Sequence, residues 1–227
     1  MMIEPLHWDS TFFDIRVGKI ASSKEAFQIP EEIPFDLLYL ESKNEFVPTL
    51  KNFTSTLTQA KVLFEKQLVT PTNEVKAIYS FSELDIPIQS LYPLAYESGA
   101  FSRFKLDPNF SRKQFKRLYK AWVAASCTGT FAHDVLMYLI EEKAAGFVAY
   151  SISEKNGTIG LIGVHPEYQG KGIGSNLLQA VENELVQLGC STLSIPTQVS
   201  NKKACSFYKK MGYSEKEITF ITHYWRQ

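Results

Sequence analysis

The sequence predicts a mixed α/β protein in which helices flank a central mixed sheet. Two observations support this class: apolar runs of strand length alternate with helical patterns along the 227 residues, and one helical pattern is strongly amphipathic. The composition, 44% hydrophobic and 13% aromatic, is sufficient for a sizeable core. The amphipathic pattern has one apolar face, made of Ile173, Leu177, Leu178, Val181, Leu185 and Leu188.

The chain is expected to divide into two domains, residues 1–74 and residues 75–227. The boundary is predicted at residues 70–73, TPTN, which are rich in turn formers. The first unit is predicted to be a small α/β domain with a strand at 37–40, a helix at 51–59 and a strand at 61–69.

The second domain continues the alternation of helices and strands. Its first half is predicted to contain a strand at 75–81, helices at 88–99 and 111–125, and strands at 135–140, 146–153 and 158–164. The amphipathic helix follows and ends at Gly189. A strand at 192–197, a helix at 201–211 closed by Gly212, and two short strands within 213–225 complete the predicted order.

Charge and cysteine content exclude several classes of protein. Twenty-four Lys and Arg balance 24 Asp and Glu, so no global field favours nucleic acid or an anionic membrane. No apolar segment approaches the ~20 residues of a membrane span, and no signal peptide is evident, so a cytoplasmic location is expected. Cys127, Cys190 and Cys205 lack metal-type spacing and are expected to be reduced thiols.

Residues 169–174, QGKGIG, form a glycine-rich loop between a predicted strand and the amphipathic helix. A Walker A loop requires glycine at position 165, where the chain has a histidine, and a dinucleotide fingerprint requires a different glycine spacing and an acid after the next strand. Both readings fail. A glycine loop at a helix N-terminus still suits a pyrophosphate, although such a loop can also be a turn that binds nothing.

The pattern Q-x-x-G-x-G, preceded by V-x-P, resembles the acetyl-coenzyme A loop of the GNAT acetyltransferases. Asn201 opens the next helix in NKKACSFYKKMGY, and Tyr208 follows two turns later, in the order and spacing of that family. The resemblance implies a GNAT fold and acetyl-CoA as cofactor. It also implies a set of cofactor-binding residues: Ile162, Gly163, Val164, Gln169, Gly170, Lys171, Gly172, Ile173, Gly174, Ser175, Asn201 and Phe207.

Tyr208 is the expected catalytic acid. A phenol with a pKa near ~10 is protonated at neutral pH and can donate to a leaving thiolate. The alternative is that Tyr208 is a core residue beside Phe207. Backbone N–H groups along 162–164 are expected to hold the thioester carbonyl. No general base is assigned, and His133, Glu97 or a chain of water molecules remain candidates.

Several segments resemble one GNAT branch, the dTDP-fucosamine acetyltransferases, which acetylate an amino group of a nucleotide-linked sugar. These segments are residues 3–13, residues 102–104, the pair Tyr119 and Trp122, and residues 129–134. The expected acceptor-binding residues are Arg103 for the diphosphate and Phe104, Tyr119 and Trp122 as flat apolar surfaces. The i, i+3 spacing of Tyr119 and Trp122 is also typical of a helix core.

Three functions therefore compete. The first is an N-acetyltransferase for a nucleotide-linked amino sugar of the dTDP-4-amino-4,6-dideoxygalactose type, by direct attack of the amine. The second is a GNAT enzyme for a protein N-terminus, a polyamine or an aminoglycoside. The third is a non-catalytic CoA-binding module. A small-molecule amine is the expected partner, and a homodimer is possible.

Overall fold

The structure is a computed structural model that describes residues 3–22, 33–70, 75 and 77–227. Within these ranges one mixed sheet has the strand order β1-β2-β3-β10-β4-β9-β8-β7-β6-β5. Its strands are β1 (Glu4–Pro5), β2 (Val17–Ser22), β3 (Leu37–Ser42), β4 (Phe53–Gln67), β5 (Ile78–Ser80), β6 (Asp134–Ile140), β7 (Lys143–Ser153), β8 (Asn156–Val164), β9 (Thr192–Gln198) and β10 (Ser214–Arg226). The predicted class is confirmed.

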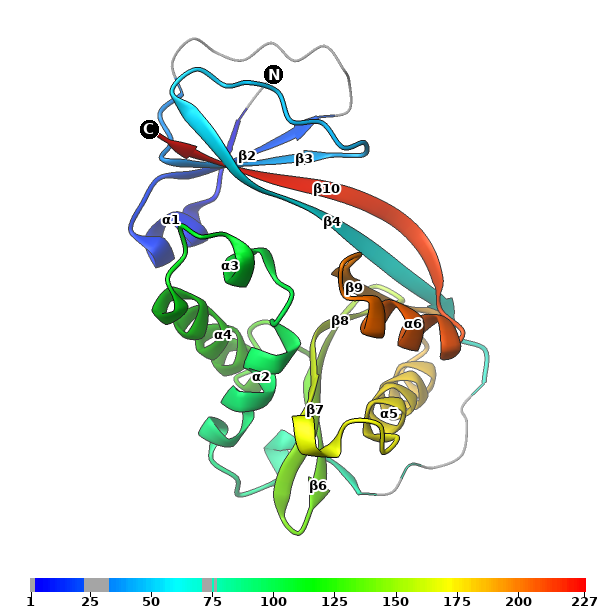
Figure 1. Cartoon of the computed structure of the whole chain (residues 1–227). Coiled ribbons are helices and arrows are strands. Elements are labelled where there is room, and N and C mark those ends of the chain that lie inside the picture. Colours follow the sequence, from blue (N-terminus) through cyan, green and yellow to red (C-terminus); the bar gives the residue numbers. More distant parts are fainter. Residues whose placement is uncertain (1–2, 23–32, 71–74, 76) are drawn as a thin grey trace.

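Helices lie on both faces of the sheet, as Figure 1 shows. They are α1 (His7–Phe13), α2 (Tyr92–Ser98), α3 (Arg103–Leu106), α4 (Arg112–Cys127), α5 (Ile173–Gln187) and α6 (Lys202–Lys210), with short 3-10 turns at Phe81–Glu83, Ile88–Leu91 and Pro166–Tyr168. Ser111 and Gln114 form a capping box that starts α4. Helices α2 and α4 pack in one core cluster and helices α5 and α6 in a second, so the sheet is covered on both sides.

The C-terminal strand β10 lies between β3 and β4, both from the N-terminal part of the chain. Strand β4 also pairs with β9 through residues 61–67, so residues on either side of position 74 share one sheet. The division into domains at 74 stays a prediction, and residues 71–73 of the predicted TPTN boundary lie outside the described residues. The N-terminal strands β1 to β3 join the rest of the sheet because β3 pairs with β10 (Figure 1).

Two predicted elements are wrong. The segment predicted as a helix at 51–59 belongs to β4, a single strand that also includes most of the strand predicted at 61–69. Thr54, Thr56 and Thr58 recur at every second position, which suits a strand, and pairing with β10 overrides the polar composition.

The second wrong prediction is the pair of short closing strands. Residues 214–226 form one strand, β10. Its pairing with β4 shifts register between Glu215 and Glu217 and between His223 and Tyr224, and these irregularities interrupt the alternation that sequence patterns detect.

The amphipathic helix α5 buries all the predicted apolar positions except Leu188, which lies beyond the last turn and is 55% exposed. Gly189 then adopts a left-handed conformation with φ of 76°, as expected of the residue that ends a helix. The three cysteines are free thiols.

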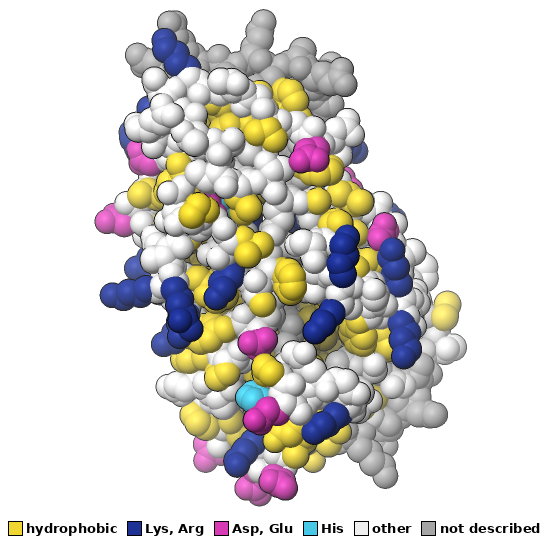
Figure 2. All heavy atoms as spheres, in the orientation of Figure 1, with side chains coloured by type: hydrophobic (Ala, Val, Ile, Leu, Met, Phe, Trp, Pro, Cys, Tyr) yellow, Lys and Arg dark blue, Asp and Glu magenta, His cyan; other side chains and the backbone are white. Residues whose placement is uncertain are grey.

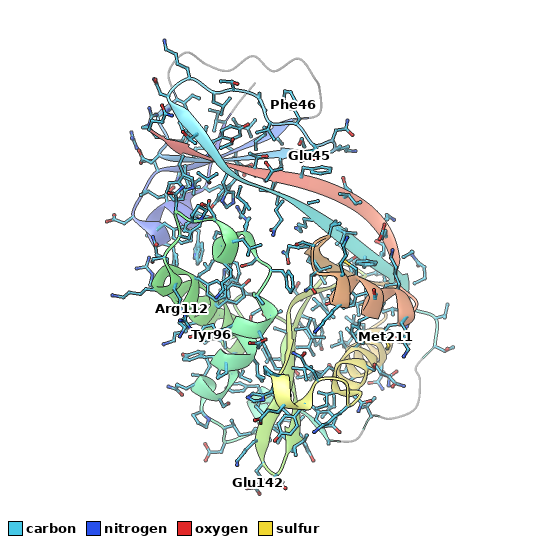
Figure 3. The ribbon with its side chains drawn as sticks, in the orientation of Figure 1. Glu45, Phe46, Tyr96, Arg112, Glu142 and Met211 are labelled. Carbon is cyan, nitrogen blue, oxygen red and sulfur yellow. The ribbon has the colours of Figure 1, made fainter. Side chains whose placement is uncertain are left out.

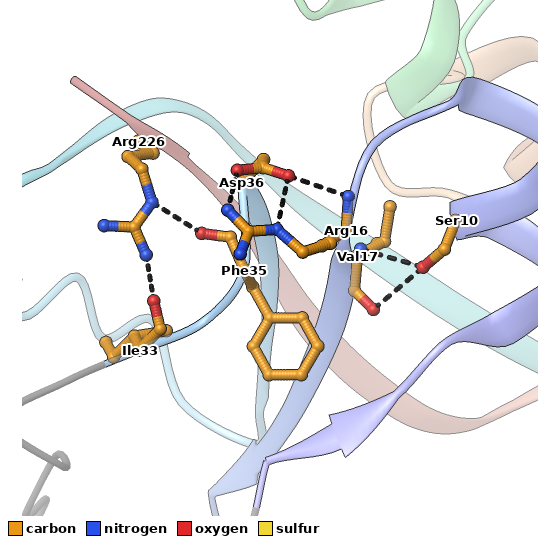
Figure 4. A network of polar contacts seen from close by, with 7 residues as sticks. All are labelled: Ser10, Arg16, Val17, Ile33, Phe35, Asp36 and Arg226. Atoms are coloured by element: carbon orange, nitrogen blue, oxygen red, sulfur yellow. Dashed lines mark hydrogen bonds and ion pairs between the residues drawn. The ribbon is translucent and has the colours of Figure 1, made fainter.

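Polar contacts join the N-terminal strands to the end of β10, as Figure 4 shows. Arg16 pairs with Asp36 at 2.6 Å, and Arg226 donates to the carbonyl oxygens of Phe35 and Ile33. Because the Arg16–Asp36 pair is exposed, it adds little to stability. No helix among the residues that the structure describes is long and apolar enough to cross a bilayer.

Candidate active site

Strands β8 and β9 diverge in the middle of the sheet. They pair in parallel only from Asn156 to Thr158, although β8 continues to Val164 and β9 to Gln198. Where they separate, β8 contains a bulge at Gly160, because Ala149 pairs with Leu161 while Tyr150 pairs with Ile159. A bulge bends a strand, and the edge of β8 that faces β9 is therefore left without a partner strand beyond 158.

A cavity of 520 Å³ opens at this divergence. Its lining comes from helices and strands along the whole described chain and includes Trp8, Asp9, Glu41, Gln59, Lys61, Glu97, Arg103, Phe104, Tyr119, Trp122, Ile159–Val164, Gln169, Ile195–Gln198, Asn201, Ala204 and Tyr208. The predicted cofactor side and the predicted acceptor side thus meet in one cavity. In Figure 3, Tyr96 on α2 and Met211 at the end of α6 mark the helices that flank β8.

The glycine loop leads into α5. Gly170 and Gly172 have φ values of 78° and 84°, which only glycine adopts without strain, and Gly172 is the N-cap. A Cβ at either glycine would meet no atom within 4 Å, so open space lies in front of the loop. The first-turn amides of α5, from Ile173 to Ser175, have no acceptor within the helix and no side-chain cap.

Other predicted cofactor residues also have structural roles. The amide of Gln169 donates to the carbonyl oxygen of Val164 at 3.2 Å, which ties the loop to the end of β8. The side chain of Ile173 is buried in the core, so only its backbone faces the loop. The ammonium of Lys171 lies 5.1 Å from the ring centre of Tyr168 and is exposed.

Helix α6 carries the last predicted residues, of which Asn201 lines the cavity and Phe207 does not. Asn201 caps it, accepting from the N–H of Ala204 at 3.2 Å, and also lines the cavity. The ring of Phe207 lies 3.4 Å from the position of a Cβ on Gly174, so the start of α6 packs against the start of α5.

Tyr208 is 5% exposed and lines the same cavity as the unpaired part of β8. Its ring contacts those of Phe64, Phe207 and Tyr213 at centroid distances of 5.6, 5.4 and 6.2 Å. Burial raises the pKa of Tyr208 well above its ordinary value, so the hydroxyl is protonated at neutral pH. Tyr208 is thus a core residue that also lines the cavity, and its role as the catalytic acid stays a prediction.

The four predicted acceptor residues line the same cavity. Phe104 and Tyr119 are almost fully buried, Trp122 is half-buried, and the Tyr119 and Trp122 rings lie 5.0 Å apart. Burial raises the pKa of Tyr119 to about 12. Arg103 stacks on Tyr39, with its guanidinium carbon 3.9 Å from the ring centre. The apolar residues hence serve both the core and the cavity wall.

The two side chains considered as general base lie in different places. Glu97, on α2, lines the cavity and is exposed. His133 lies outside it, with its ring 5.7 Å from that of Tyr150, and lines a separate cavity with Glu184.

Sequence reasoning missed several cavity residues. Asp9 and Glu41 add carboxylates, and burial raises the pKa of Asp9. Trp8 and Lys61 add an aromatic ring and a cation, and Gln59 donates to the carbonyl oxygen of Phe101 at 2.7 Å. Of these residues, only Trp8 and Asp9 could have been found from the sequence, because they belong to the segment 3–13 that resembles the sugar acetyltransferases. Gln59 and Lys61 had none, since their segment was predicted as a helix and a separate strand.

The model of the acetyltransferase (GNAT) family matches residues 94–213, more than half of the chain. The protein therefore belongs to the GNAT family and is an acetyl-CoA-dependent N-acetyltransferase. Among curated relatives, it is similar to the dTDP-fucosamine acetyltransferase of Escherichia coli O6:H1 (strain CFT073), with 27% identity over 230 residues, 98% of this chain and 96% of the relative.

Solved structures agree on the fold. A functionally unknown conserved protein of Staphylococcus epidermidis aligns with a TM-score of 0.57 at 15% identity, covering 85% of this chain and 74% of its own. A GCN5-related N-acetyltransferase of Sphaerobacter thermophilus aligns with a TM-score of 0.53 at 16% identity, covering 84% of this chain and 60% of its own. At these identities the likeness shows the fold alone.

Proposed function

We propose that the enzyme transfers the acetyl group of acetyl-CoA to the amine of a nucleotide-linked amino sugar, of the dTDP-4-amino-4,6-dideoxygalactose type, by direct attack. The observation that carries this proposal is the single cavity where the opened edge of β8 and Tyr208 face an arginine set among aromatic rings. The full-length similarity to a dTDP-fucosamine acetyltransferase supports the choice of acceptor.

The residues on the donor side fit coenzyme A. The uncapped amides of α5 and the open space beside Gly170 and Gly172 suit a pyrophosphate, which the helix dipole also stabilises. The unpaired edge of β8 along Ile162, Gly163 and Val164 offers backbone groups to an extended pantetheine arm, as in the addition of a strand. We assign the donor site to these strand residues together with Gln169, Gly170, Lys171, Gly172, Ile173, Gly174, Ser175, Asn201 and Phe207.

The catalytic role falls to Tyr208. Acetyl-CoA supplies an activated acetyl group and a thiol leaving group. Backbone N–H groups of β8 stabilise negative charge on the carbonyl oxygen, and the Tyr208 hydroxyl donates its proton to the leaving thiolate. Because its pKa is raised, the hydroxyl keeps its proton until the thiolate leaves. Glu97, which lines the cavity, is our candidate to accept the proton of the amine, directly or through water.

Basic residues on the surface and an arginine in the cavity suit an anionic acceptor, although the whole chain has no net charge. Figure 2 shows Lys and Arg side chains gathered over α4 and α6. Helix α4 carries Arg112, Lys113, Lys116, Arg117 and Lys120 along one face, and Arg103 lies inside the cavity. In this proposal Arg103 binds the diphosphate, while Phe104, Tyr119 and Trp122 provide apolar surfaces for the sugar and the base. Cytoplasmic location and a homodimer stay predictions.

The test measures release of free CoA with a panel of amines: dTDP-linked 4-amino sugars, the corresponding free amino sugars, polyamines and peptides. We expect turnover with the dTDP-linked sugars and little with the free sugars. Turnover confined to polyamines or peptides would assign another GNAT acceptor. No release with any amine, in a protein that binds CoA, would indicate a non-catalytic module.

A further inference from the structure

A buried carboxylate lies behind the cavity. Asp107 is 1% exposed and accepts four hydrogen bonds. The donors are the hydroxyl of Thr56 at 3.1 Å, the N–H of Asn109 at 3.0 Å, the Nδ1 of His223 at 2.6 Å and the Nε1 of Trp225 at 2.9 Å. These bonds keep its pKa below the ordinary range despite burial, so Asp107 is a fixed anion.

His223 joins this anion to Arg103. The imidazole has no exposed surface, and its Nε2 lies 3.0 Å from a terminal nitrogen of the Arg103 guanidinium. A guanidinium only donates, so Nε2 must accept and Nδ1 must carry the proton given to Asp107. Both ring nitrogens are therefore used, and the ring is neutral with one defined tautomer. Burial, which lowers the pKa of His223 to about 4, favours the same state.

Arg103 reaches the cavity from this support. Its guanidinium lies between the rings of Tyr39 and Phe104, with its carbon 3.9 and 4.4 Å from their centres. Among the described residues it forms no ion pair with a carboxylate, and Asp9, which lines the same cavity, lies beyond ion-pair distance. One terminal nitrogen is engaged by His223, and the positive charge of Arg103 also acts on Asp9, where it opposes the rise in the Asp9 pKa that burial causes.

Because a neutral imidazole lies between the Asp107 carboxylate and the Arg103 guanidinium, the charge of the arginine is not cancelled. A direct, bidentate Asp–Arg pair would use two N–H groups of the arginine and cancel its charge. The arrangement here orients the guanidinium through a single bond and leaves the positive charge available in the cavity. This is the arrangement that an arginine needs if it is to bind a doubly charged phosphate group from a fixed position.

We propose that Asp107 and His223 are positioning residues that hold the Arg103 guanidinium for the diphosphate of the acceptor. The inference rests on the proposed function, because it takes the acceptor to be a nucleoside diphosphate derivative. It goes further because it assigns the recognition of that diphosphate to three residues: Arg103 on α3, Asp107, which follows α3, and His223 on β10.

The test uses calorimetry of dTDP binding, with thymidine as the ligand that lacks phosphate. Arg103→Met should weaken dTDP about 10- to 100-fold, the effect of losing charge-assisted hydrogen bonds, and leave thymidine unchanged. Equal dTDP affinity in wild type and Arg103→Met would overturn the assignment.

Two variants of His223 separate positioning from a merely structural role. His223→Gln places an amide oxygen near the position of Nε2 and can still accept from Arg103, whereas His223→Asn keeps only the donor to Asp107. We expect His223→Asn to weaken dTDP roughly tenfold and to raise the acceptor KM at unchanged kcat, and His223→Gln to rescue most of the affinity. Equal effects of the two folded variants would refute the positioning role.

A measurement on the wild-type protein covers the case in which the variants do not fold. Side-chain ¹⁵N NMR should show His223 as the neutral Nδ1–H tautomer at pH 7, with an Nε2 shift that changes when dTDP binds. A proton on Nε2 would contradict the inference. The results also distinguish the two proposals. If dTDP binds through Arg103 but no acetyl group is transferred, only the proposed function is refuted. If the enzyme acetylates a dTDP-sugar but dTDP binding does not depend on Arg103, only the positioning role is refuted.

Discussion

At the scale of single residues, Tyr208 is both a core residue and our proposed catalytic acid. Its ring packs in the aromatic cluster with Phe64 and Tyr213, and the residue also lines the cavity. Replacing the tyrosine with phenylalanine should therefore preserve packing and remove only the proton donor.

We predict that Tyr208→Phe lowers kcat by about 10²- to 10³-fold, the usual contribution of a general acid, with little change in acetyl-CoA affinity. Stopped assays for CoA release and calorimetry check the two quantities. Tyr213→Phe is the matched control, since that hydroxyl donates to the buried Glu182 at 2.7 Å and lies outside the cavity. The control should lose about 1–3 kcal/mol of stability and keep its kcat. An unchanged kcat in Tyr208→Phe would remove Tyr208 from the mechanism.

At the scale of elements, the start of α5 is a glycine loop whose backbone conformation matters more than its side chains. We predict that Gly172→Val weakens CoA binding at least tenfold, because a β-branched residue resists φ of 84° and the first-turn amides shift. Gly189→Val is the matched control: it has φ of 76° and equally open surroundings at the other end of the same helix. Calorimetry with CoA should show loss in the first variant only. Equal CoA affinity in both would separate the loop from the donor site.

The contact between α2 and β8 sets one wall of the cavity. A Cβ on Gly163 would lie 2.3 Å from the carbonyl oxygen of Leu94, so α2 could not stay in place. We predict that Gly163→Ala costs about 1–3 kcal/mol, the range for overpacking, as measured by chemical denaturation. Gly160→Ala on the same strand is the control, since its Cβ would meet nothing closer than 3.9 Å. Similar stability losses in the two variants would show that the close approach is not the cause.

At the scale of the whole molecule, the Asp107–His223 pair links the C-terminal cap of α3 to β10, and it makes stability depend on pH. The folded pKa of His223, about 4, lies below the ordinary value of 6.5. Below pH 6.5 the unfolded chain binds a proton that the folded chain refuses, so stability falls as the pH drops from about 6.5 to about 4. The loss amounts to about 3 kcal/mol at most.

Urea denaturation between pH 7 and pH 4 measures this loss, with His223→Gln as the reference. Asp9 and Glu184, whose pKa values burial raises, act in the opposite direction in this range, and the variant keeps both. The difference between wild type and His223→Gln should therefore shrink as the pH falls. A constant difference would show that His223 titrates normally in the folded protein.

The central helices and strands of the chain were predictable because their patterns are local. Helix α5 has a continuous apolar face, and β6 to β8 are apolar runs bounded by turns. The glycine loop and the spacing from Asn201 to Tyr208 could also be recognised, since each lies within a short stretch of sequence. These features were enough to expect the GNAT class, which the family match then showed.

Only the tertiary structure decided the course of β4 and β10 and the residues that line the cavity around Arg103. The strand identity of residues 53–59 comes from pairing with a segment about 160 positions later, which no local pattern contains. For the same reason the pairing of His223 with Asp107 could not be predicted from the sequence, because the two residues are 116 positions apart and meet only in the folded chain. The sequence by itself determined the glycine loop and the class of chemistry, because both depend on local spacing. The position of Arg103 and the shape of the cavity around it were decided by long-range strand pairing, which fixes the neighbours of each residue.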